Sequence, residues 1–594
     1  MGIALDTSKG FKVRTQPAIS KDADEDPMTI TVEDVDSTVQ KLARSRSDIW
    51  TASACGVTRA DRRIVALIDR DAYVPDTDRV RVLLVGGLSG RPGGAAMALD
   101  ALRLFADAGH RLSSKIALSA VPCGNPGGLT LRSGPSNGAG GFANAGYPPM
   151  DGFYNHQFSP EPRYIWRWIC YQAPDLVLEL QSGQETRWGS NAAAGPLSQA
   201  LEAVDAGPAD SLIAALGRGA PDSPGTIPGL RLNTPPASFS EEIERLWELL
   251  ITALPGPSEA RATLNTRRSR SHVEVGRDLG KTNGRTLSPL IYTQGVAISG
   301  RLRLSSLDPA TMGNLDDVAA LVDPVVADPA KAFGTAPQAP NLAAIVWAEE
   351  LGSSTADPRY NDASVVAASY FAPRDEGEAP LPLNTNFIVE DFFFASAVLG
   401  RAYRATNDLS YINLLTEFLL GAGTQEDSGL FPHSRRGPFH WGRGNGFAAL
   451  GLAEALTYMP ANYPSRNSVL GMCQKQMEAL KHLQEPSGTY LQLIDFPGSY
   501  QELTATCMIG YSMARGIRLG WLDGSYRSVV DLAWQGVSER VDPEGNIVDG
   551  CTGTGVLDNL RSYLDRPANS GYDDRSGSMA LWFAAEMERL ARGG

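Results

Sequence analysis

Residues 441–447, with the sequence Trp-Gly-Arg-Gly-Asn-Gly-Phe, combine side chains suited to binding a sugar. Glycines have no Cβ, so a ligand can approach their backbone closely. Arg443 carries a planar fork of donors that matches a carboxylate, and the rings of Trp441 and Phe447 are flat faces on which a sugar can stack. The same pattern also fits a turn at the start of a helix with a core tryptophan. The surrounding sequence has to decide between these two interpretations.

Five other motifs surround this segment in a set order. They are 387–395, which holds Glu390 and Asp391 among phenylalanines, 429–433 (Gly-Leu-Phe-Pro-His), 499–508, 551–555 (Cys-Thr-Gly-Thr-Gly) and 573–578 (Asp-Asp-Arg-Ser-Gly-Ser). In order and spacing, this series resembles the unsaturated glucuronyl and rhamnogalacturonyl hydrolases, glycoside hydrolase families 88 and 105. The resemblance covers about residues 335–594, less than half of the chain.

The resemblance implies an oligosaccharide substrate that ends in a 4,5-unsaturated uronic acid. In these families an aspartic acid protonates the ring double bond, and water then adds at C5. Here Glu390 stands in the catalytic position and Asp391 in a variable one, while a second family aspartate falls near Asn341. The extra methylene of a glutamate would displace the acid by about an ångström, which can cost roughly a hundredfold in rate. Either the substrate sits differently, or Asp391 has become the acid, or the domain no longer does this chemistry.

Glu390 and Asp391 are expected at the N-terminus of a helix, among four phenylalanines. Apolar surroundings disfavour the charged form of a carboxyl and raise its pKa, which a proton donor needs near neutral pH. Neighbouring residues of a helix do not share a face. The sequence therefore predicts that only one of the two carboxyls points at the substrate.

The resemblance also implies ligand contacts for residues of the other motifs. His433 would touch the substrate, and the Arg443 guanidinium with the Gly444 amide would hold a carboxylate or a hydroxyl. Trp441 and Phe447 would stack on the sugar.

Three further candidates flank these residues. His440 is a possible ligand contact, while Glu502 and Thr504 stand in a Glu-Thr run of the family. Glu502 would orient Arg443 or a sugar hydroxyl, or would cap its own helix. A structural salt bridge is expected of the charged residues 573–575.

The N-terminal half has the pattern of a mainly parallel α/β sheet domain. Apolar strands are predicted at 80–85, 116–121 and 175–180, with an amphipathic helix at 94–108. The stretch 205–240 is rich in proline, glycine and alanine and is expected to be a loop.

Three motifs of this half, at 83–92, 125–129 and 175–183, resemble the zinc carboxypeptidase and succinylglutamate desuccinylase family. Where that family has its three metal ligands, this chain has Ser89, Pro92 and Gln181, which are poor zinc ligands or none. We therefore expect no metal. The domain is then a scaffold, or alternatively retains a role in anion binding or substrate gating.

The predicted domain organisation has three parts: a polar segment 1–40, a carboxypeptidase-like α/β domain 41–300 and an all-α domain 301–594. Ten helical patterns follow one another from Asp308 onward, which predicts an (α/α) toroid. A basic cluster bridges the two domains, either as a solvated loop or as a lip that attracts an acidic saccharide. Its residues are Arg261, Arg267, Arg268, Arg270 and His272.

Composition restricts the class of partner. The 594 residues include 53 basic and 67 acidic side chains, a net charge of −14, without a basic run, so no nucleic-acid partner is expected. The chain has no apolar leader and no run of roughly 18 apolar residues, so we expect no membrane partner and a cytoplasmic location. Six scattered cysteines without CxxC spacing agree with that location.

The sequence predicts a glycoside hydrolase for short acidic oligosaccharides, without a cofactor. It leaves two alternatives open, a hydrolase of saturated uronosides or a polysaccharide lyase on the same toroid, and a non-catalytic carbohydrate-binding protein. It also leaves the sugar and the oligomeric state open.

Overall fold

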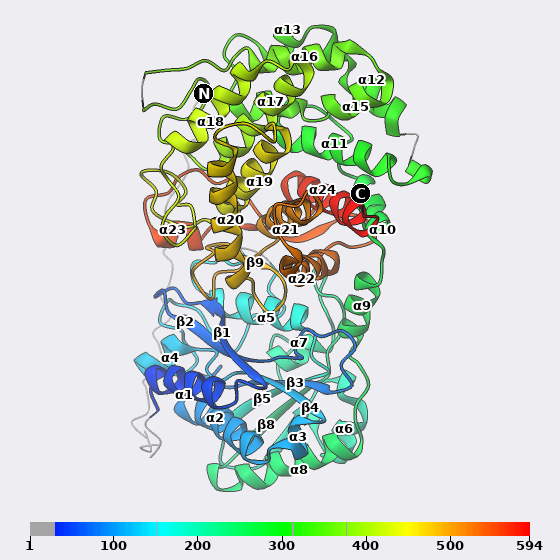
Figure 1. Ribbon diagram of the computed structural model, residues 1–594. Coiled ribbons are helices and arrows are strands. Elements are labelled where there is room, and N and C mark those ends of the chain that lie inside the picture. Colours follow the sequence, from blue (N-terminus) through cyan, green and yellow to red (C-terminus); the bar gives the residue numbers. More distant parts are fainter. Residues whose placement is uncertain (1–29, 151–152, 312–313, 376, 594) are drawn as a thin grey trace, which may run out of the picture.

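The computed structural model describes residues 30–593 apart from 151–152, 312–313 and 376. An α/β domain lies against a helical domain (Figure 1). The first described helix, α1 (Val32–Ser45), begins with a capping box between Thr31 and Asp34 and packs its valines into the core of the sheet domain. The predicted polar segment 1–40 therefore includes part of a packed helix, while residues 1–29 lie outside the described residues.

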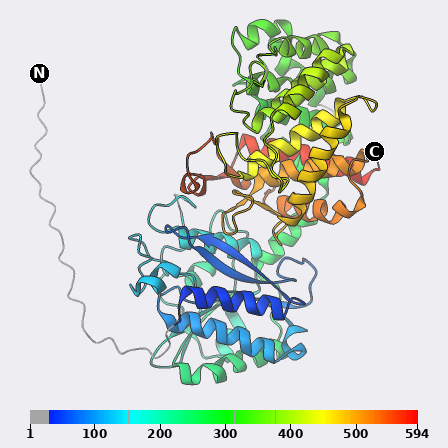
Figure 2. The same ribbon diagram turned by 60° about the vertical axis from the view of Figure 1, so that its left-hand side comes forward.

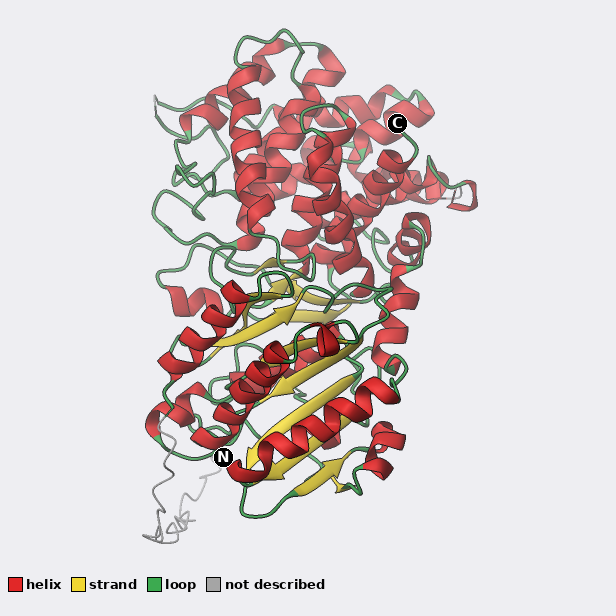
Figure 3. Ribbon diagram, turned by 60° about the horizontal axis from the view of Figure 1, so that its bottom comes forward, coloured by secondary structure: helices red, strands yellow, loops and turns green. Residues whose placement is uncertain are grey.

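A mixed eight-stranded sheet forms the core of the α/β domain, in the order β1-β2-β4-β3-β5-β8-β6-β7. The central strands β4, β3, β5 and β8 run parallel. Helices cover both faces, so every residue of β3 and β4 is buried (Figure 3). The strands are β1 (Trp50–Val57), β2 (Arg63–Asp69), β3 (Val80–Val85), β4 (Ile116–Val121), β5 (Leu176–Ser182), β6 (Arg187–Ser190), β7 (Val204–Asp205) and β8 (Gly229–Thr234).

Two sets of helices enclose this sheet. With α1, the helices α2 (Pro92–Asp107) and α8 (Phe239–Thr252) pack on one face. The other face is covered by α5 (Pro160–Gln172), α7 (Leu212–Leu216) and α9 (Glu259–Arg268). Shorter helices complete the domain: α3 (His110–Ser113), α4 (Pro126–Leu131) and α6 (Gly195–Ala200).

The predicted strands at 80–85, 116–121 and 175–180 correspond to β3, β4 and β5. The expectation of a loop over 205–240 is wrong, because this stretch contains the inner strand β8. Arg231 interrupts the apolar pattern of β8, and its charge is neutralised within the sheet by Glu179 at 2.9 Å. A short strand with a central arginine has no clear apolar signature.

In the helical domain, long helices form an inner ring in which each packs against the next: α17, α19, α21, α24 and α11. The short helices α14 and η4 (Ala343–Ile345) close the ring between α11 and α17, in agreement with the predicted (α/α) toroid. None of the described helices is both long and apolar enough to cross a bilayer. The inner helices are α11 (Tyr292–Ser305), α14 (Ala339–Leu342), α17 (Glu390–Thr406), α19 (Gly442–Tyr458), α21 (Leu503–Arg518) and α24 (Asp574–Ala591).

A second set of helices packs around this ring (Figure 2). The outer helices are α10 (His272–Gly280), α12 (Asn314–Ala327), α16 (Pro358–Ala368), α18 (Leu409–Gly421), α20 (Arg466–His482) and α22 (Arg527–Glu539). Shorter elements are α13 (Pro329–Phe333), α15 (Ala348–Thr355), α23 (Leu560–Leu564) and the strands β9 (Tyr490–Leu491), β10 (Gln501–Glu502), β11 (Ile547–Cys551) and β12 (Ala568–Gly571).

The boundary predicted at residue 300 falls inside α11. Both α10 and α11 pack against α24 at the other end of the helical domain, so they belong to that domain by contact. Helix α11 is buried on all sides from Tyr292 to Leu304, and such a helix has no amphipathic stripe. Its sequence therefore gives no sign that the helical domain has already begun.

The basic cluster 261–272 is neither a solvated loop nor a lip of the cavity, because its side chains join the two domains. Arg261 pairs with the buried Asp175 of the sheet domain at 2.7 Å. Arg268 pairs with Glu539 at the end of α22, and Arg270 donates to the carbonyl of Ser538 at 2.9 Å. Helix α9 is thereby fixed to both domains.

Buried ion pairs connect the C-terminal parts of the inner helices. Glu454 of α19 accepts from Arg401 of α17 at 2.9 Å and from Arg515 of α21. Although burial opposes its charged form, Arg515 and Arg401 lower the pKa of Glu454 to about 2. Nearby, Arg303 of α11 pairs with Glu350 of α15 at 2.7 Å. We call these five residues the ion cluster.

Replacing Glu454 by glutamine leaves Arg401 and Arg515 buried without their shared anion. Breaking a buried pair in this way costs about 3–5 kcal/mol of unfolding free energy, measurable by urea denaturation at neutral pH. The pKa of Glu454 is lowered by folding, so its contribution is complete above about pH 4.3, the unfolded value, and disappears as the pH falls toward 2. Glu417→Gln, on the exposed face of α18, is the matched control. A loss no larger than that of the control would contradict this role.

Candidate active site

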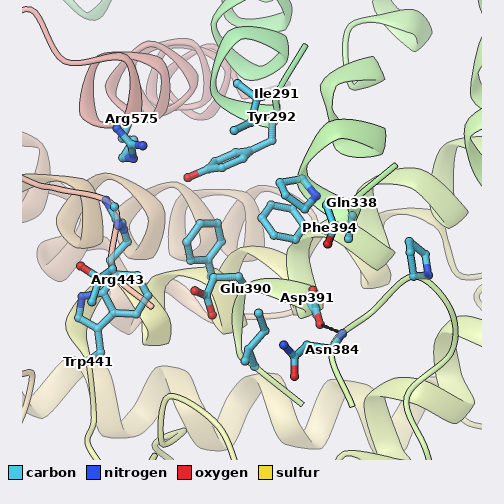
Figure 4. Close-up of a pocket in the computed structure, with 17 residues that line it drawn as sticks. Ile291, Tyr292, Gln338, Asn384, Glu390, Asp391, Phe394, Trp441, Arg443 and Arg575 are labelled. Atoms are coloured by element: carbon cyan, nitrogen blue, oxygen red, sulfur yellow. Dashed lines mark hydrogen bonds between the residues drawn. The ribbon is translucent and has the colours of Figure 1, made fainter. Parts of the chain in front are cut away.

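A cavity of about 370 Å³ opens where the N-terminal ends of the inner helices meet (Figure 4). Its wall includes the first turns or caps of α11, α14, α17, α19 and α24, through Tyr292, Gln338, Glu390, Arg443 and Arg575. Helix N-termini carry a partial positive charge, so they attract an anion even in this acidic chain. The cavity is also lined by Ile291, Ala339, Pro340, Pro382, Asn384, Ile388, Asp391, Phe394, Trp441, Phe447, Gly553 and Thr554.

Both Glu390 and Asp391 line this cavity, so the expectation that only one of them faces it is wrong. The two residues form the first turn of α17, and the cavity extends around the end of the helix instead of along one face. Glu390 lies on the side of Arg443 and Trp441, and Asp391 lies on the side of Asn384 (Figure 4). A single ligand can therefore meet both carboxyls.

Asp391 is the more enclosed of the two carboxyls, with 3% of its surface exposed. Its Oδ2 accepts a hydrogen bond from the backbone N–H of Asn384 at 2.7 Å. Burial disfavours the ionised form and raises the pKa of Asp391 to about 8, with the neighbouring Glu390 acting in the same direction. At neutral pH Asp391 therefore carries a proton that it can give to a ligand.

Glu390 is connected to a buried histidine. Its Oε1 lies 3.3 Å from Nε2 of His433, and Nδ1 of the same ring lies 2.6 Å from the hydroxyl of Tyr563. With the proton on Nε2, the imidazole accepts from Tyr563 and donates to Glu390. The second oxygen of Glu390 accepts no hydrogen bond from the described part of the protein. His433 lies behind Glu390 and does not line the cavity itself, so any contact with a ligand passes through Glu390.

Arg443 lines the cavity but is committed to the protein backbone. It is 2% exposed, and its two terminal nitrogens donate to the carbonyls of Cys551 and of Thr552, the latter at 2.7 Å. Its guanidinium also lies over the ring of Trp441, 4.7 Å from the centroid. The prediction that Arg443 binds the ligand carboxylate with its fork of donors needs correction, because the fork holds the loop after β11.

Arg575 is a second cation at the cavity, and among the described residues only Asp574 accepts from it. It lines the cavity from the first turn of α24, with 32% of its side chain exposed, and it forms an ion pair with the adjacent Asp574 at 3.2 Å. The expected salt bridge within 573–575 is therefore present. A ligand-facing role for Arg575 was not predicted, although the charged motif at the start of the last helix was the signal for it.

Aromatic rings form one wall of the cavity, as predicted for Trp441 and Phe447. Phe447 packs against Phe394 and Tyr292, each with ring centroids 5.7 Å apart. Tyr292 and Gln338 were not identified from the sequence, because both lie before the first recognisable motif and carry no local pattern of their own.

Three predicted ligand contacts lie outside the cavity wall. Asn341 donates to the carbonyl of Leu290 at 2.8 Å, and its neighbours 338–340 face the cavity instead. Gly444 packs closely, since a Cβ there would meet the side chain of Val389 at 2.8 Å. His440 binds the carboxylate of Asp495 at 2.6 Å, and this hydrogen bond raises the pKa of the imidazole.

Glu502 and Thr504 also lie beneath the cavity rather than in its wall. Glu502 caps α21 by accepting from the N–H groups of Thr504 and Ala505, each at 2.7 Å, which is the capping alternative left open above. It also accepts from the N–H of Cys551 at 2.9 Å. The hydroxyl of Thr504 bonds that of Ser576 at 2.8 Å. Glu502 thereby fixes Cys551, whose carbonyl accepts from Arg443, and Thr504 fixes the first turn of α24, which carries Arg575.

The three positions where a zinc site would lie in the α/β domain have structural contacts. Pro92 is the first residue of α2, and Gln181 donates to Glu179 at 2.6 Å. Ser89 lies in the turn before α2. Within the described residues, no group of three or more histidine, cysteine, aspartate or glutamate side chains is placed to hold a metal.

Residues 424–591 match the sequence model described as Glycosyl Hydrolase Family 88. The matched part includes His433, Arg443 and Arg575, whereas Glu390 and Asp391 precede it. The resemblance of the N-terminal half to carboxypeptidases stays a prediction, since the matched residues lie in the other half.

Curated relatives match the same kind of enzyme over short segments. The chain is 30% identical over 148 residues to the unsaturated rhamnogalacturonyl hydrolase YesR of Bacillus subtilis, covering 25% of this chain and 41% of that protein. It is 26% identical over 113 residues to an unsaturated 3S-rhamnoglycuronyl hydrolase of Alteromonas, covering 18% and 27%. Both segments span less than half of the relative. A crystal structure described as a possible member of the GH105 family, from Salmonella enterica, overlays with 20% identity and a TM-score of 0.47, covering 55% of this chain and 94% of that one.

The environment of Asp391 makes a prediction that needs no substrate. Its carboxyl should be protonated at neutral pH and ionise near pH 8, because burial penalises the charge. Burial also raises the pKa values of Glu161 and Glu485 to about 7, so the infrared spectrum of Asp391→Asn is subtracted from that of the wild type. The difference should show a protonated carboxyl band that disappears with a midpoint near pH 8. Asp531→Asn, on exposed α22, should leave the band unchanged. A difference spectrum without that band at neutral pH would contradict this assignment.

Proposed function

We propose that the helical domain is a glycoside hydrolase that hydrates a 4,5-unsaturated uronic acid at the non-reducing end of short acidic oligosaccharides. The observation that carries the proposal is the cavity itself, where a protonated carboxyl and a second carboxyl face one space together with Arg575. The family match of residues 424–591 and the names of the two relatives support the same class of substrate.

Positive charge at the cavity would bind the uronate carboxylate. Arg575 has guanidinium donors free for a carboxylate, and the helix N-termini around it add to the positive potential. The sugar ring would stack against the aromatic wall of Trp441 and Phe447. Arg443 contributes charge and holds the loop that carries Gly553 and Thr554.

The two carboxyls would divide the proton transfers. Asp391 gives its proton to C4 of the double bond, and a water molecule adds at C5 while Glu390 takes a proton from that water. The pair of His433 and Tyr563 orients Glu390 for this step. The hemiketal formed at C5 then opens and releases the next sugar, and proton exchange with solvent restores Asp391 and Glu390.

This division of roles also suits the glutamate at the family's catalytic position. In the alternative that Asp391 became the acid, Glu390 does not have to reach C4. Its longer side chain instead takes the proton from the water that adds at C5. We infer from the opposite environments of the two carboxyls that this alternative fits best.

The direct experiment follows the ultraviolet absorbance of the conjugated double bond while the protein is supplied with lyase-made oligosaccharides. Loss of absorbance is expected for hydration. A gain from saturated polysaccharide would indicate a lyase, and cleavage without a change would indicate a hydrolase of saturated uronosides. Binding without any turnover across the panel would favour the non-catalytic alternative.

Substitution of the two cavity arginines should separate their roles. Arg575→Ala should weaken use of uronate-ended substrates by roughly ten- to a hundredfold, since a partly exposed charge partner is lost, and should hardly affect a neutral analogue. Arg443→Ala should reduce turnover of charged and neutral substrates alike, because it releases the backbone of Cys551 and Thr552. Steady-state kinetics on both substrates measures the difference. A charge-selective loss in Arg443→Ala with none in Arg575→Ala would reverse the assignment.

A further inference from the structure

We propose that the α/β domain positions the catalytic groups of the helical domain through residues 547–571, here called the rim segment. It contains β11, a loop, α23 and β12, and β11 pairs with β12. Figures 1 and 2 place α23 near the β1–β2 hairpin. This role depends on the proposed function, because the groups being positioned are the ones assigned above.

On the side of the cavity, the rim segment contacts both halves of the site. The carbonyls of Cys551 and Thr552 accept from Arg443. The hydroxyl of Tyr563, on α23, bonds Nδ1 of His433 at 2.6 Å, and the imidazole passes this contact on to the carboxylate of Glu390. A displacement of the rim segment would therefore move both the guanidinium of Arg443 and the carboxylate of Glu390, the proposed proton acceptor.

On the side of the α/β domain, a buried ion pair holds β11. Asp549 lies 3.3 Å from Nε of Arg167 on α5 and accepts from the hydroxyl of Tyr154 at 3.2 Å. Asp549 has φ of +64°, and the pairing with β12 shifts register at this position. A left-handed residue persists where its surroundings fix it. Arg167 and Tyr154 thus fix the backbone two residues before Cys551.

The turn between β1 and β2 holds α23 in the same way. Arg59 pairs with Asp565 at 2.6 Å, and Arg561 donates to the carboxylate of Asp61 and to the carbonyl of Thr58, the latter at 2.8 Å. Residues 561 and 565 lie on either side of Tyr563. The turn therefore sets the position of the hydroxyl that orients His433.

These outer ion pairs are better suited to positioning than to stability. Their side chains are 23–47% exposed, and ion pairs of that exposure add little to folding. Buried contacts join the two domains elsewhere, through Arg167 and through α9. A displacement of about an ångström at a catalytic group, in contrast, can cost roughly a hundredfold in rate.

The test removes the contacts between the turn and α23 and asks whether the resulting loss of kcat depends on Tyr563. The variant Arg59→Ala with Asp61→Gly deletes both acid–base contacts, and glycine suits the positive φ of residue 61. We expect kcat to fall roughly ten- to a hundredfold with KM within about twofold. In a Tyr563→Phe background, the same change should lower kcat by less than about threefold, because the hydrogen bond between Tyr563 and His433 is already absent.

Arg46→Ala is the matched control, since this arginine is as exposed as Arg59, pairs with Asp48 on the same domain and lies away from the rim segment. It should leave kcat unchanged. Independent, multiplying losses from the turn variant and from Tyr563→Phe would overturn the positioning role. Should the turn variant fail to fold, Asp565→Asn, which removes the ion pairs of residue 565 with Arg59 and Arg561, takes its place in the same cycle.

Hydrogen exchange provides a readout that does not need turnover. Loss of the turn contacts should accelerate amide exchange in peptides covering 551–566 and 433–443, and Arg46→Ala should not. Unchanged exchange in those peptides would overturn the inference. Accelerated exchange in a protein that turns over no unsaturated substrate would support the mechanical link while refuting the proposed function.

Discussion

The inner helices of the helical domain run in a common direction, and the rest of the structure follows from that constraint. Parallel helix dipoles side by side are unfavourable unless both ends find compensating charge. At the C-terminal ends, Arg303, Arg401 and Arg515 provide it within the ion cluster. At the N-terminal ends, the positive potential collects around a cavity, and a protein of net charge −14 thereby has a place for an anion.

The same geometry gives the carboxyls of Glu390 and Asp391 different environments. A helix N-terminus favours ionised carboxylates by about 0.3–1 kcal/mol, whereas one pKa unit corresponds to about 1.4 kcal/mol. Burial takes the pKa of Asp391 from 3.8 to about 8, so desolvation outweighs the dipole there. Glu390 lies on the other side of the helix end, within reach of His433. Two adjacent residues thus have different environments because the cavity wraps around the end of α17.

Much of the helical domain could be predicted from the sequence, because amphipathic helices show their period and the motifs keep their order. Helix α11 and strand β8 could not, since one is buried on all sides and the other contains a paired arginine. At the cavity, Trp441 and Phe447 were found from residue type together with the order of the surrounding motifs. Tyr292 reaches the cavity only through tertiary packing, so no local pattern predicts it.

The roles of Arg443 and Arg575 show a further limit of prediction from sequence. Sequence pattern indicates that Arg443 carries a fork of donors, but not that backbone carbonyls of a distant loop occupy it. Likewise, Glu502 has the residue type of a ligand contact and the geometry of a helix cap. Predictions based on residue type succeed where a side chain faces the cavity, and they fail where neighbouring backbone takes the donors or acceptors.

The central claim is that a solvent proton is added to C4 of an unsaturated uronic acid. The most direct measurement is the reaction of a lyase-made disaccharide in deuterium oxide, followed by NMR of the released uronic product early in the reaction. Hydration predicts a single deuterium on one face of C4 in the first product formed, together with loss of the double bond. Release of the neighbouring sugar with the double bond intact and no deuterium at C4 would contradict the account.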